Sequence, residues 1–331
     1  MKLATLKNGT RDGRLAVVSR DLSRAVLTDA TMPTLQHALE QWQACAPQLQ
    51  ALFDALERNE AHGAFAFNAS DAMAPLPRAY QFVDASAFLN HGEIMTRAFN
   101  LTVNVPAGVP ILIQRQADDF RGPCDDYRFP TEADNGDFEG EVAVITDSIP
   151  MGSSPAECEN RILLLTMFND VSMRYHLTRE LGMGFGFIQA KPASVFAPVA
   201  VTPDELGDAW QDGRVHLDLQ VSRNGGWFGN PNGREMDFGF GELLSHLAYN
   251  RNLGAGTVLG SGTFSNRNAQ SVGSTCLAER RALDVIEHGQ IHTPFLSSGE
   301  RLRFEMLNRD GTSLFGAIDN RYFASATDNG A

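Results

Sequence analysis

Two acidic side chains stand at the start of an apolar segment in the run Asp-Phe-Glu-Gly-Glu-Val-Ala-Val-Ile, which begins at Asp137. Because successive side chains of a strand point to opposite faces, Glu139 and Glu141 face the same way. The apolar residues 142–145 predict that this strand enters a core. Two like charges at that position cost several kcal/mol each unless a cation or a proton compensates them. The segment therefore predicts a packed sheet with two acids at its mouth, where a divalent metal ion would compensate them.

The composition limits the class of protein. The chain has 331 residues, of which 43% are hydrophobic, and this favours an ordered globular protein with a sizeable core. Its net charge of −13 argues against nucleic acid or an anionic membrane surface as a partner. The sequence shows neither a signal peptide nor about 18 uninterrupted apolar residues, so we expect no membrane helix. The four cysteines show no zinc-ligand spacing, which favours free thiols in a cytoplasmic protein.

The first 76 residues predict a small β unit with a helical arm. Residues 15–19 and 24–28 are typical of short strands. Pro33 and Pro47 each predict the start of a helix, since apolar residues follow both at helical spacing. Residues 68–77, rich in alanine and proline, are predicted to form a linker. Nothing in this unit points to catalysis.

Residues 77–331 are mostly β by pattern. The predicted strands are residues 141–146, 194–201, 215–222, 257–262 and 301–308. The predicted helices are residues 85–99, part of 156–175, and 240–250. The connections are too irregular for a doubly wound parallel sheet. We therefore expect a mixed α/β, β-rich fold, a mixed β-roll with flanking helices.

Asp84 and His91 are candidates for chemistry. If a helix begins near Asp84, the seven-residue step to His91 is about two turns and places both on one face. The alternative is that Asp84 is a helix N-cap and His91 a surface residue.

Asp170 and Lys191 extend the set. Asp170 follows the apolar run 162–165, so we expect it where a buried segment reaches the surface. There it could complete an oxygen site for Mg²⁺ or Mn²⁺, or form a turn with its own backbone. Lys191 precedes the strand predicted from residue 194. It could balance negative charge near the metal, or stabilise a developing enolate. Otherwise it is a structural lysine whose ammonium reaches solvent.

The ordered set of these motifs resembles the fumarylacetoacetate hydrolase family. The motifs are Asp84 with His91, Asp137-Phe-Glu-Gly-Glu141, Asn169-Asp-Val-Ser-Met-Arg174, Lys191 and Gly260-Ser-Gly-Thr263. The resemblance covers roughly residues 78–315, and the N-terminal unit resembles the small SH3-like β domain of longer members. It implies a mixed β-sandwich roll for residues 77–331, a homodimer, and one Mg²⁺, Ca²⁺ or Mn²⁺ per subunit.

The resemblance also implies roles for individual residues. The positions matching the family's metal-binding carboxylates are Asp84, Glu139, Glu141 and Asp170. His91 matches the general base, and Lys191 matches the lysine near metal and substrate. Thr263 matches a threonine that contacts the substrate.

Three substrate-facing positions depart from the family pattern. Ser86 stands where the true fumarylacetoacetate hydrolases have a tyrosine, and Leu177 stands where they have a glutamine. Asn100 replaces an arginine, although Arg97 lies one turn earlier and could serve in its place. Ser86 and Arg97 therefore remain candidates for substrate binding. The pattern does not support fumarylacetoacetate itself as the substrate.

The acid that orients the family histidine is also displaced. An ungapped match falls on Leu277, and Glu279 lies two residues later. On a strand, Glu279 would share the face of Leu277. We therefore predict Glu279 as the partner of His91.

The implied function is hydrolysis of a carbon–carbon bond in a 1,3-dicarbonyl acid, of the acylpyruvate or fumarylacetoacetate type, in aromatic catabolism. The partners implied are a small dicarboxylic or 2-oxo acid and a second copy of the chain, with no nucleic acid and no membrane. One alternative is a metal-dependent decarboxylase, hydratase or dehydratase of a 2-oxo acid that acts through an enolate. Another is a non-catalytic scaffold that Ca²⁺ stabilises.

Overall fold

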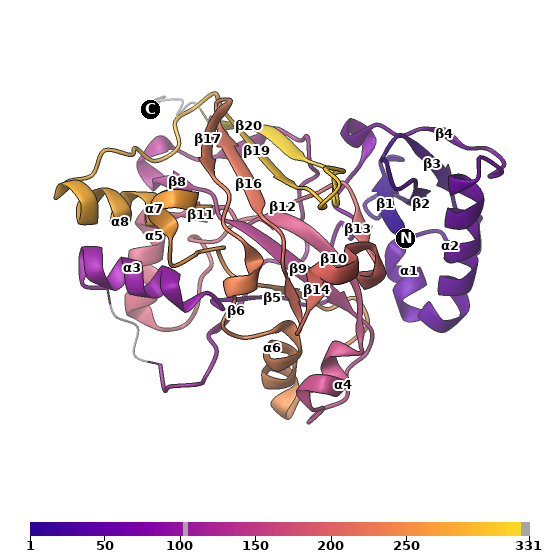
Figure 1. Cartoon of the computed structure of the whole chain (residues 1–331), viewed down its shortest axis with the longest axis horizontal. Helices are drawn as coiled ribbons and strands as arrows, with labels where there is room; N and C mark the ends of the chain where they lie inside the picture. The colour runs from indigo at the N-terminus through magenta and orange to yellow at the C-terminus, as the bar shows by residue number, and fades with distance from the viewer. Residues whose placement is uncertain (102–104, 326–331) are drawn as a thin grey trace, which may run out of the picture.

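A mixed sheet of 11 strands runs through the molecule (Figure 1). The structure is a computed structural model that describes residues 1–101 and 105–325. The strand order is β4-β3-β2-β1-β13-β10-β9-β18-β5-β6, and β12 pairs with β10. The bounds are β1 Lys2–Leu6, β2 Arg14–Val18, β3 Arg24–Leu27, β4 Phe65–Ala66, β5 Phe82–Ala85, β6 Leu112–Gln114, β9 Gly140–Thr146, β10 Ile162–Asn169, β12 Val195–Phe196, β13 Ala200–Val201 and β18 Val258–Gly260. The pair β18–β5 is parallel.

A second sheet has the order β17-β16-β19-β20-β7. Its strands are β7 Tyr127–Phe129, β16 Leu219–Arg223, β17 Gly226–Gly229, β19 Glu300–Met306 and β20 Ile318–Ala324. Two small antiparallel pairs complete the strands: β8 Gly136–Asp137 with β11 Ser172–Met173, and β14 Trp210–Gln211 with β15 Arg214–Val215.

The helices lie around these sheets. They are α1 Leu35–Glu40, α2 Trp42–Glu57, α3 Leu89–Phe99, α4 Pro155–Glu159, α5 Arg174–Met183, α6 Phe240–Leu247, α7 Ala269–Val272 and α8 Leu277–His288. Short 3₁₀ helices are η1 Ala69–Asp71, η2 Glu132–Asp134, η3 Pro203–Ala209, η4 Gly233–Glu235 and η5 Ala248–Asn250. Among the described residues, none of the helices has the length and apolar character needed to cross a membrane.

The central strands are buried on both faces. In β9, Val142 and Val144 belong to a core shared with the second sheet, which contributes Phe304. Ala143 and Ile145 face the opposite way, into a core that also includes residues of α2. Because both faces of β9 are covered, its sequence is continuously apolar rather than alternating. The strand can therefore carry acids only at its end, where Glu141 lies.

The N-terminal strands extend the same large sheet. β1 pairs with β13 in antiparallel register, with Lys2 opposite Val201. The buried ammonium of Lys2 donates to the carbonyl oxygens of Ser313 at 2.8 Å and Leu314 at 2.7 Å. The predicted linker, residues 68–77, packs several side chains into the interior, including Ala74 at 0% exposure. The division of the chain at residues 76 and 77 stays a proposal.

Several sequence-based assignments of elements were wrong. Within 156–175, where a helix was predicted in part, α4 ends at Glu159 and the middle is strand β10, because a strand buried on both faces has an apolar run without the two-residue alternation. Residues 85–99 begin at the end of β5, and α3 starts only at Leu89. Pro47 lies inside α2 rather than opening it. The predicted strands 194–201 and 215–222 are each divided into two shorter ones.

Candidate active site

Three carboxylates converge at the end of the central strands. Asp84 lies in β5, Glu141 in β9, and Asp170 directly follows β10. An oxygen atom from each lies within 4.8 Å of the oxygen atoms of the other two. All three side chains are buried. The sheet register brings them together, since β18 lies between β5 and β9 and pairs with both.

The Gly-Ser-Gly-Thr turn after β18 is fitted to these acids. Gly260 is opposite Asp84, and a Cβ at position 260 would lie 2.4 Å from Asp84 Oδ1. Gly262 has a φ of +84°, which favours glycine, and its N–H donates to Glu141 Oε2 at 2.8 Å. The turn therefore makes room for one carboxylate and orients another.

Glu139 lies beside this group but contacts two cations. Its Oε1 accepts from the Arg174 guanidinium, and its Oε2 accepts from Lys191 Nζ at 2.7 Å. Of the four predicted metal ligands, the structure brings Asp84, Glu141 and Asp170 together. A metal-binding role for Glu139 stays a prediction.

Lys191 bridges two of the acids. Its ammonium donates to Glu139, and also to Asp170 Oδ2 at 2.6 Å. The residue is 6% exposed, so the ammonium does not reach solvent as the structural alternative required. Lys191 is thus in place to balance surplus negative charge.

The pKa values of these acids shift in opposite directions, upward for Asp84 and Glu141 and downward for Glu139. Burial, and then the neighbouring charge of Asp170, raise the pKa of Asp84 to about 7. Burial and the charge of Asp84 raise the pKa of Glu141 well above its usual value. Burial also acts to raise the pKa of Glu139, but the charges of Lys191 and Arg174 outweigh it and hold that pKa well below its usual range. Glu139 is therefore compensated by two cations, whereas the negative charges of Asp84 and Glu141 are not compensated by an ion pair among the described residues.

The residues fit a divalent cation. Asp84 Oδ1 and Glu141 Oε1 are buried and have no hydrogen-bond partner among the described residues. Such oxygen atoms are costly unless a cation or a proton meets them. A site of carboxylate oxygens suits Mg²⁺, Ca²⁺ or Mn²⁺. Asp84, Glu141 and Asp170 are the residues that would hold the ion.

His91 and Glu279 form a pair near these acids. His91 Nδ1 lies 2.8 Å from Glu279 Oε2, and Glu279 is fully buried. A carboxylate at this position accepts a hydrogen bond from Nδ1–H, which keeps the proton on Nδ1 and leaves Nε2 free to act as a base. Burial acts to raise the pKa of Glu139, and the charges of Lys191 and Arg174 lower it; a positive charge on His91 lowers it too, by less.

The pair forms in a different way from the one expected. Glu279 lies in the first turn of helix α8, not on a strand. Asp84 and His91 do not share a helix face, because Asp84 is on β5 and His91 on α3. α3 packs against α8 through residues such as Ile94, and this contact brings His91 to Glu279.

Asp137 fixes where α8 begins. Its carboxylate accepts from the backbone N–H groups of Leu277 at 2.7 Å and Ala278 at 2.9 Å. An acid at a helix N-terminus satisfies N–H groups that have no partner within the helix. Arg174 also binds this carboxylate, with Nε 2.7 Å from Oδ2. The segment that carries Glu139 and the helix that carries Glu279 are thus held together.

The predicted substrate-binding residues lie near the end of β5 and on α3. Gly262 packs closely against the backbone at Ser86, which places Thr263 next to the end of β5. Arg97 lies exposed on α3, and no contact between it and the carboxylates is seen in the described part of the chain. Ser86, Thr263 and Arg97 all stay candidates for substrate binding.

Sequence reasoning missed three residues that hold Asp170 and Glu139. The Arg115 guanidinium and Ser194 Oγ, at 3.2 Å, both donate to Asp170 Oδ1. Arg174 holds Glu139, and its place in the motif that starts at Asn169 was an available signal. Arg115 and Ser194 lie in no motif, so no local pattern indicated them.

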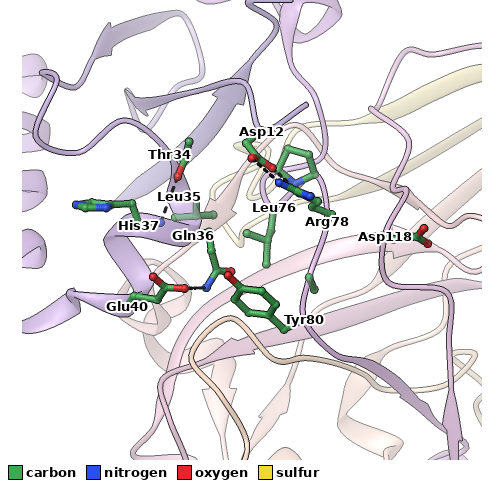
Figure 2. A pocket seen from close by; sticks show the side chains of 12 residues that line it. Asp12, Thr34, Leu35, Gln36, His37, Glu40, Leu76, Arg78, Tyr80 and Asp118 are labelled. Carbon is green, nitrogen blue, oxygen red and sulfur yellow. Dashed lines mark hydrogen bonds and ion pairs between the residues drawn. The ribbon is translucent and has the colours of Figure 1, made fainter. Parts of the chain in front are cut away.

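A cavity of about 430 Å³ lies elsewhere, between α1 and the segment 76–80 (Figure 2). Figure 2 shows that Asp12 and Arg78 bind each other on its wall, with Arg78 Nε 2.7 Å from Asp12 Oδ1. Gln36 Nε2 likewise donates to Glu40 at 2.9 Å. None of the predicted site residues lines this cavity. It is distinct from the carboxylate site.

Comparisons with known proteins show the family of the chain. The domain described as "Fumarylacetoacetate (FAA) hydrolase C-terminal" matches residues 81–321, and "Fumarylacetoacetase N-terminal domain 2" matches residues 1–78. The 2,4-didehydro-3-deoxy-L-rhamnonate hydrolase of Sphingomonas sp. (strain SKA58) is 28% identical over 157 residues, 46% of this chain. That match spans about half of the relative, 52% of its length.

Solved structures share the fold over the whole chain. Maleylpyruvate hydrolase from Sphingobium sp. SYK-6, in complex with manganese(II) and pyruvate, has a TM-score of 0.65 at 14% identity, covering 98% of this chain and 100% of that one. The 5-carboxymethyl-2-hydroxymuconate delta-isomerase of Mycobacterium smegmatis has a TM-score of 0.61 at 17% identity, covering 99% and 100%. The predicted mixed α/β, β-rich fold with an N-terminal domain is confirmed.

Proposed function

The chain belongs to the fumarylacetoacetate hydrolase family, and on that premise we propose that it is a metal-dependent hydrolase that cleaves a carbon–carbon bond in a 1,3-dicarbonyl acid. One observation carries the proposal. An imidazole oriented by a buried carboxylate lies near three convergent acids and a buried ammonium. A scaffold that only needed a structural cation would have no use for the pair of His91 and Glu279.

The residues divide the chemistry among them. A divalent ion held by Asp84, Glu141 and Asp170 would polarise the substrate oxygen atoms as a Lewis acid. His91 Nε2 takes a proton from the attacking water, while Glu279 keeps the other ring nitrogen protonated and stabilises the imidazolium. Water then adds to the carbonyl carbon, and the carbon–carbon bond breaks.

The departing carbon must carry the electron pair of the broken bond. In a 1,3-dicarbonyl acid, the remaining keto group delocalises this pair as an enolate. The ammonium of Lys191 is a buried positive charge that stabilises the enolate oxygen until a proton arrives at carbon. The products are two acids.

The named relatives support this substrate class. The rhamnonate-derived substrate named for the Sphingomonas relative and the maleylpyruvate named for the Sphingobium enzyme are both 2,4-dioxo acids. Each therefore has two carbonyl groups separated by one carbon. We infer an acylpyruvate-type substrate for this chain, met in the breakdown of aromatic compounds or of sugar acids.

A panel of acylpyruvates with each divalent ion tests the proposal. We expect His91→Ala to keep Mn²⁺ affinity but to lose turnover by about 10²–10⁴-fold, because the water then has no base. His246→Ala, an exposed histidine on α6, is the matched control and should remain active. Undiminished hydrolysis by His91→Ala would remove this residue from the mechanism, and wild-type turnover after complete chelation would remove the metal.

The alternative outcome from a bound enolate is decarboxylation, hydration or dehydration of a 2-oxo acid, and isomerisation is a further reaction of such an enolate. The isomerase named among the similar structures favours keeping this alternative. Product analysis separates the reactions, since a decarboxylase releases CO₂ and a hydrolase yields two acids. The homodimer implied by the family likewise stays a proposal, to be checked by the mass of the protein in solution.

A further inference from the structure

Arg115 is a buried cation behind the carboxylate site. It directly follows β6, and its backbone N–H donates to the Phe82 carbonyl at 2.9 Å, which fixes it next to the strand of Asp84. The residue is 5% exposed, and its guanidinium donates through Nη2 to Asp170 Oδ1. Its Cζ lies 6.0 Å from the centre of the Phe82 ring. Arg115 thus lies between an aromatic ring and a proposed metal ligand.

Hydrogen bonding alone does not explain this side chain. Arg115 Nε and Nη1 are buried and have no acceptor among the described residues. Leaving buried donors unpaired costs free energy, so an arginine kept only for one hydrogen bond would be a poor choice. Ser194 already donates to the same oxygen of Asp170 without any charge. The property that Arg115 adds is a permanent positive charge.

The positive charge of Arg115 affects the net charge of the carboxylate site. Among the described residues, the acids joined by the carboxylate cluster and by its ion pairs are Asp84, Asp137, Glu139, Glu141 and Asp170. The bases that contact them are Arg115, Arg174 and Lys191. Five acids against three bases leave an excess of two negative charges when all are ionised. One divalent cation cancels this excess, whereas loss of Arg115 would leave an excess of three.

We propose that Arg115 sets the charge of the metal site to that of a divalent cation. The proposal rests on the metal site of the proposed function and adds a residue that determines the preferred valence of the ion. Lys191 contributes a charge of the same sign, but it bridges two acids. Of the acids among the described residues, Arg115 forms an ion pair only with Asp170 and acts through it, so it is a positioning residue and not a ligand.

Competition between Mn²⁺ and Tb³⁺ on the full chain tests this role. Both are oxygen-seeking ions; free Mn²⁺ is counted by electron paramagnetic resonance, and Tb³⁺ is titrated against it. Removing one buried positive charge favours the trivalent ion, because the extra ionic charge then meets an uncompensated acid. We expect Arg115→Gln to shift the Tb³⁺-to-Mn²⁺ affinity ratio toward Tb³⁺ by roughly tenfold or more. Neither measurement needs a substrate.

Two variants separate charge from hydrogen bonding. Ser194→Ala removes a neutral donor to the same oxygen of Asp170, and Arg115→Lys keeps the charge. Both should leave the ratio within about twofold of wild type if charge is the determinant. A shift in Ser194→Ala as large as that in Arg115→Gln would overturn the proposal.

The outcomes also distinguish failure of the proposed role of Arg115 from failure of the proposed metal site. If the wild type binds neither Mn²⁺ nor Tb³⁺, the proposed metal site fails. If it binds both and the ratio is unchanged in Arg115→Gln, only the role of Arg115 fails. Should Arg115→Gln not fold, Arg115→Met offers an apolar chain against Phe82. Failure of both variants to fold even with excess Tb³⁺ would also overturn the proposal, because the third ionic charge should replace the missing one.

Discussion

The carboxylate of Glu279 uses one oxygen for His91 and leaves the other, Oε1, without a partner among the described residues. A fully buried acid with a free oxygen is costly unless its charge is needed. Its position behind an imidazole supplies that need, because the imidazolium that forms during proton transfer is stabilised there. At the scale of single residues, this pair distinguishes a reaction centre from a cation-binding site.

Glu279→Gln tests this reading. The amide keeps the shape of the side chain but loses the charge and can donate to Nδ1, which favours the wrong tautomer. We expect kcat to fall by about 10²–10⁴-fold while Mn²⁺ affinity stays unchanged. Glu287→Gln, on the same helix but partly exposed, is the control. Equal activity of the two variants would show that Glu279 does not act through His91.

Gly260→Ala is a second prediction for a single residue. The added Cβ would meet Asp84 Oδ1 at 2.4 Å and the Phe168 ring at 2.7 Å, so one of them must move. We expect at least a tenfold loss of Mn²⁺ affinity, and destabilisation of about 1–3 kcal/mol, the usual cost of overpacking. Gly254→Ala precedes the same strand and meets nothing within 4 Å. Titration calorimetry measures the Mn²⁺ affinity of both variants. Equal affinities would contradict the inference that Gly260 makes room for the Asp84 carboxylate.

At the scale of elements, the connection from α5 to Lys191 is fastened by one acid. Glu180 accepts from the backbone N–H groups of Ile188 at 2.9 Å, Gln189 at 2.9 Å and Ala190 at 3.1 Å. These three donors outweigh the opposing influence of burial and lower the pKa of Glu180. Ala190 directly precedes Lys191, so the anchored connection determines where the ammonium lies.

Two results are expected from this anchor. Glu180→Gln should lower kcat by about tenfold, because one amide oxygen cannot accept from all three N–H groups. In the wild type, the lowered pKa means that the anchor is intact above the ordinary pKa of a glutamate and is lost as pH falls through the folded value. Hydrogen-exchange protection of residues 188–190 should therefore decrease at acid pH in the wild type. Unchanged protection over that range would contradict the anchor.

At the scale of the whole molecule, the N-terminal strands and the rest of the chain form one sheet. Lys2 is fully buried at this junction and donates to two carbonyl groups from the C-terminal part of the chain. Burial lowers the pKa of Lys2 to about 8, and nearby acids such as Glu205 only partly oppose it. We therefore expect the chain to unfold in a single cooperative transition.

The pH dependence of that transition has a definite sign. The folded pKa of Lys2 lies below the unfolded value, so its charge opposes folding most strongly below pH 8. This cost is relieved as pH rises from about 8 to about 10.4, the usual pKa of a lysine. Relative to Lys2→Met, the wild type should gain about 1 kcal/mol per pH unit over this range. Urea unfolding of both proteins at pH 7.5 and pH 10 measures the difference; a constant difference would contradict it.

The sequence by itself determined those features that depend on local spacing. The apolar run after Glu141 indicated a covered sheet, and Glu141 does lie at the start of a buried strand, β9. Glu139 precedes that strand, so its common face with Glu141 stays a prediction. The ordered motifs identified the family, and with it the class of fold and the acids that the structure brings together. Each of these signals lies within a few residues of the chain, where the geometry of a strand or a turn fixes the relation.

Only the tertiary structure decided which distant groups meet. His91 and Glu279 are 188 positions apart, and their contact depends on helix α8 rather than on the strand we expected. Arg115 is 55 positions from Asp170 and belongs to no motif. Glu139 lies two residues from Glu141 in sequence, yet Arg174 and Lys191 hold its carboxylate. Such contacts are set by sheet order and helix packing, which bury charges together over long separations and leave no periodicity in the chain.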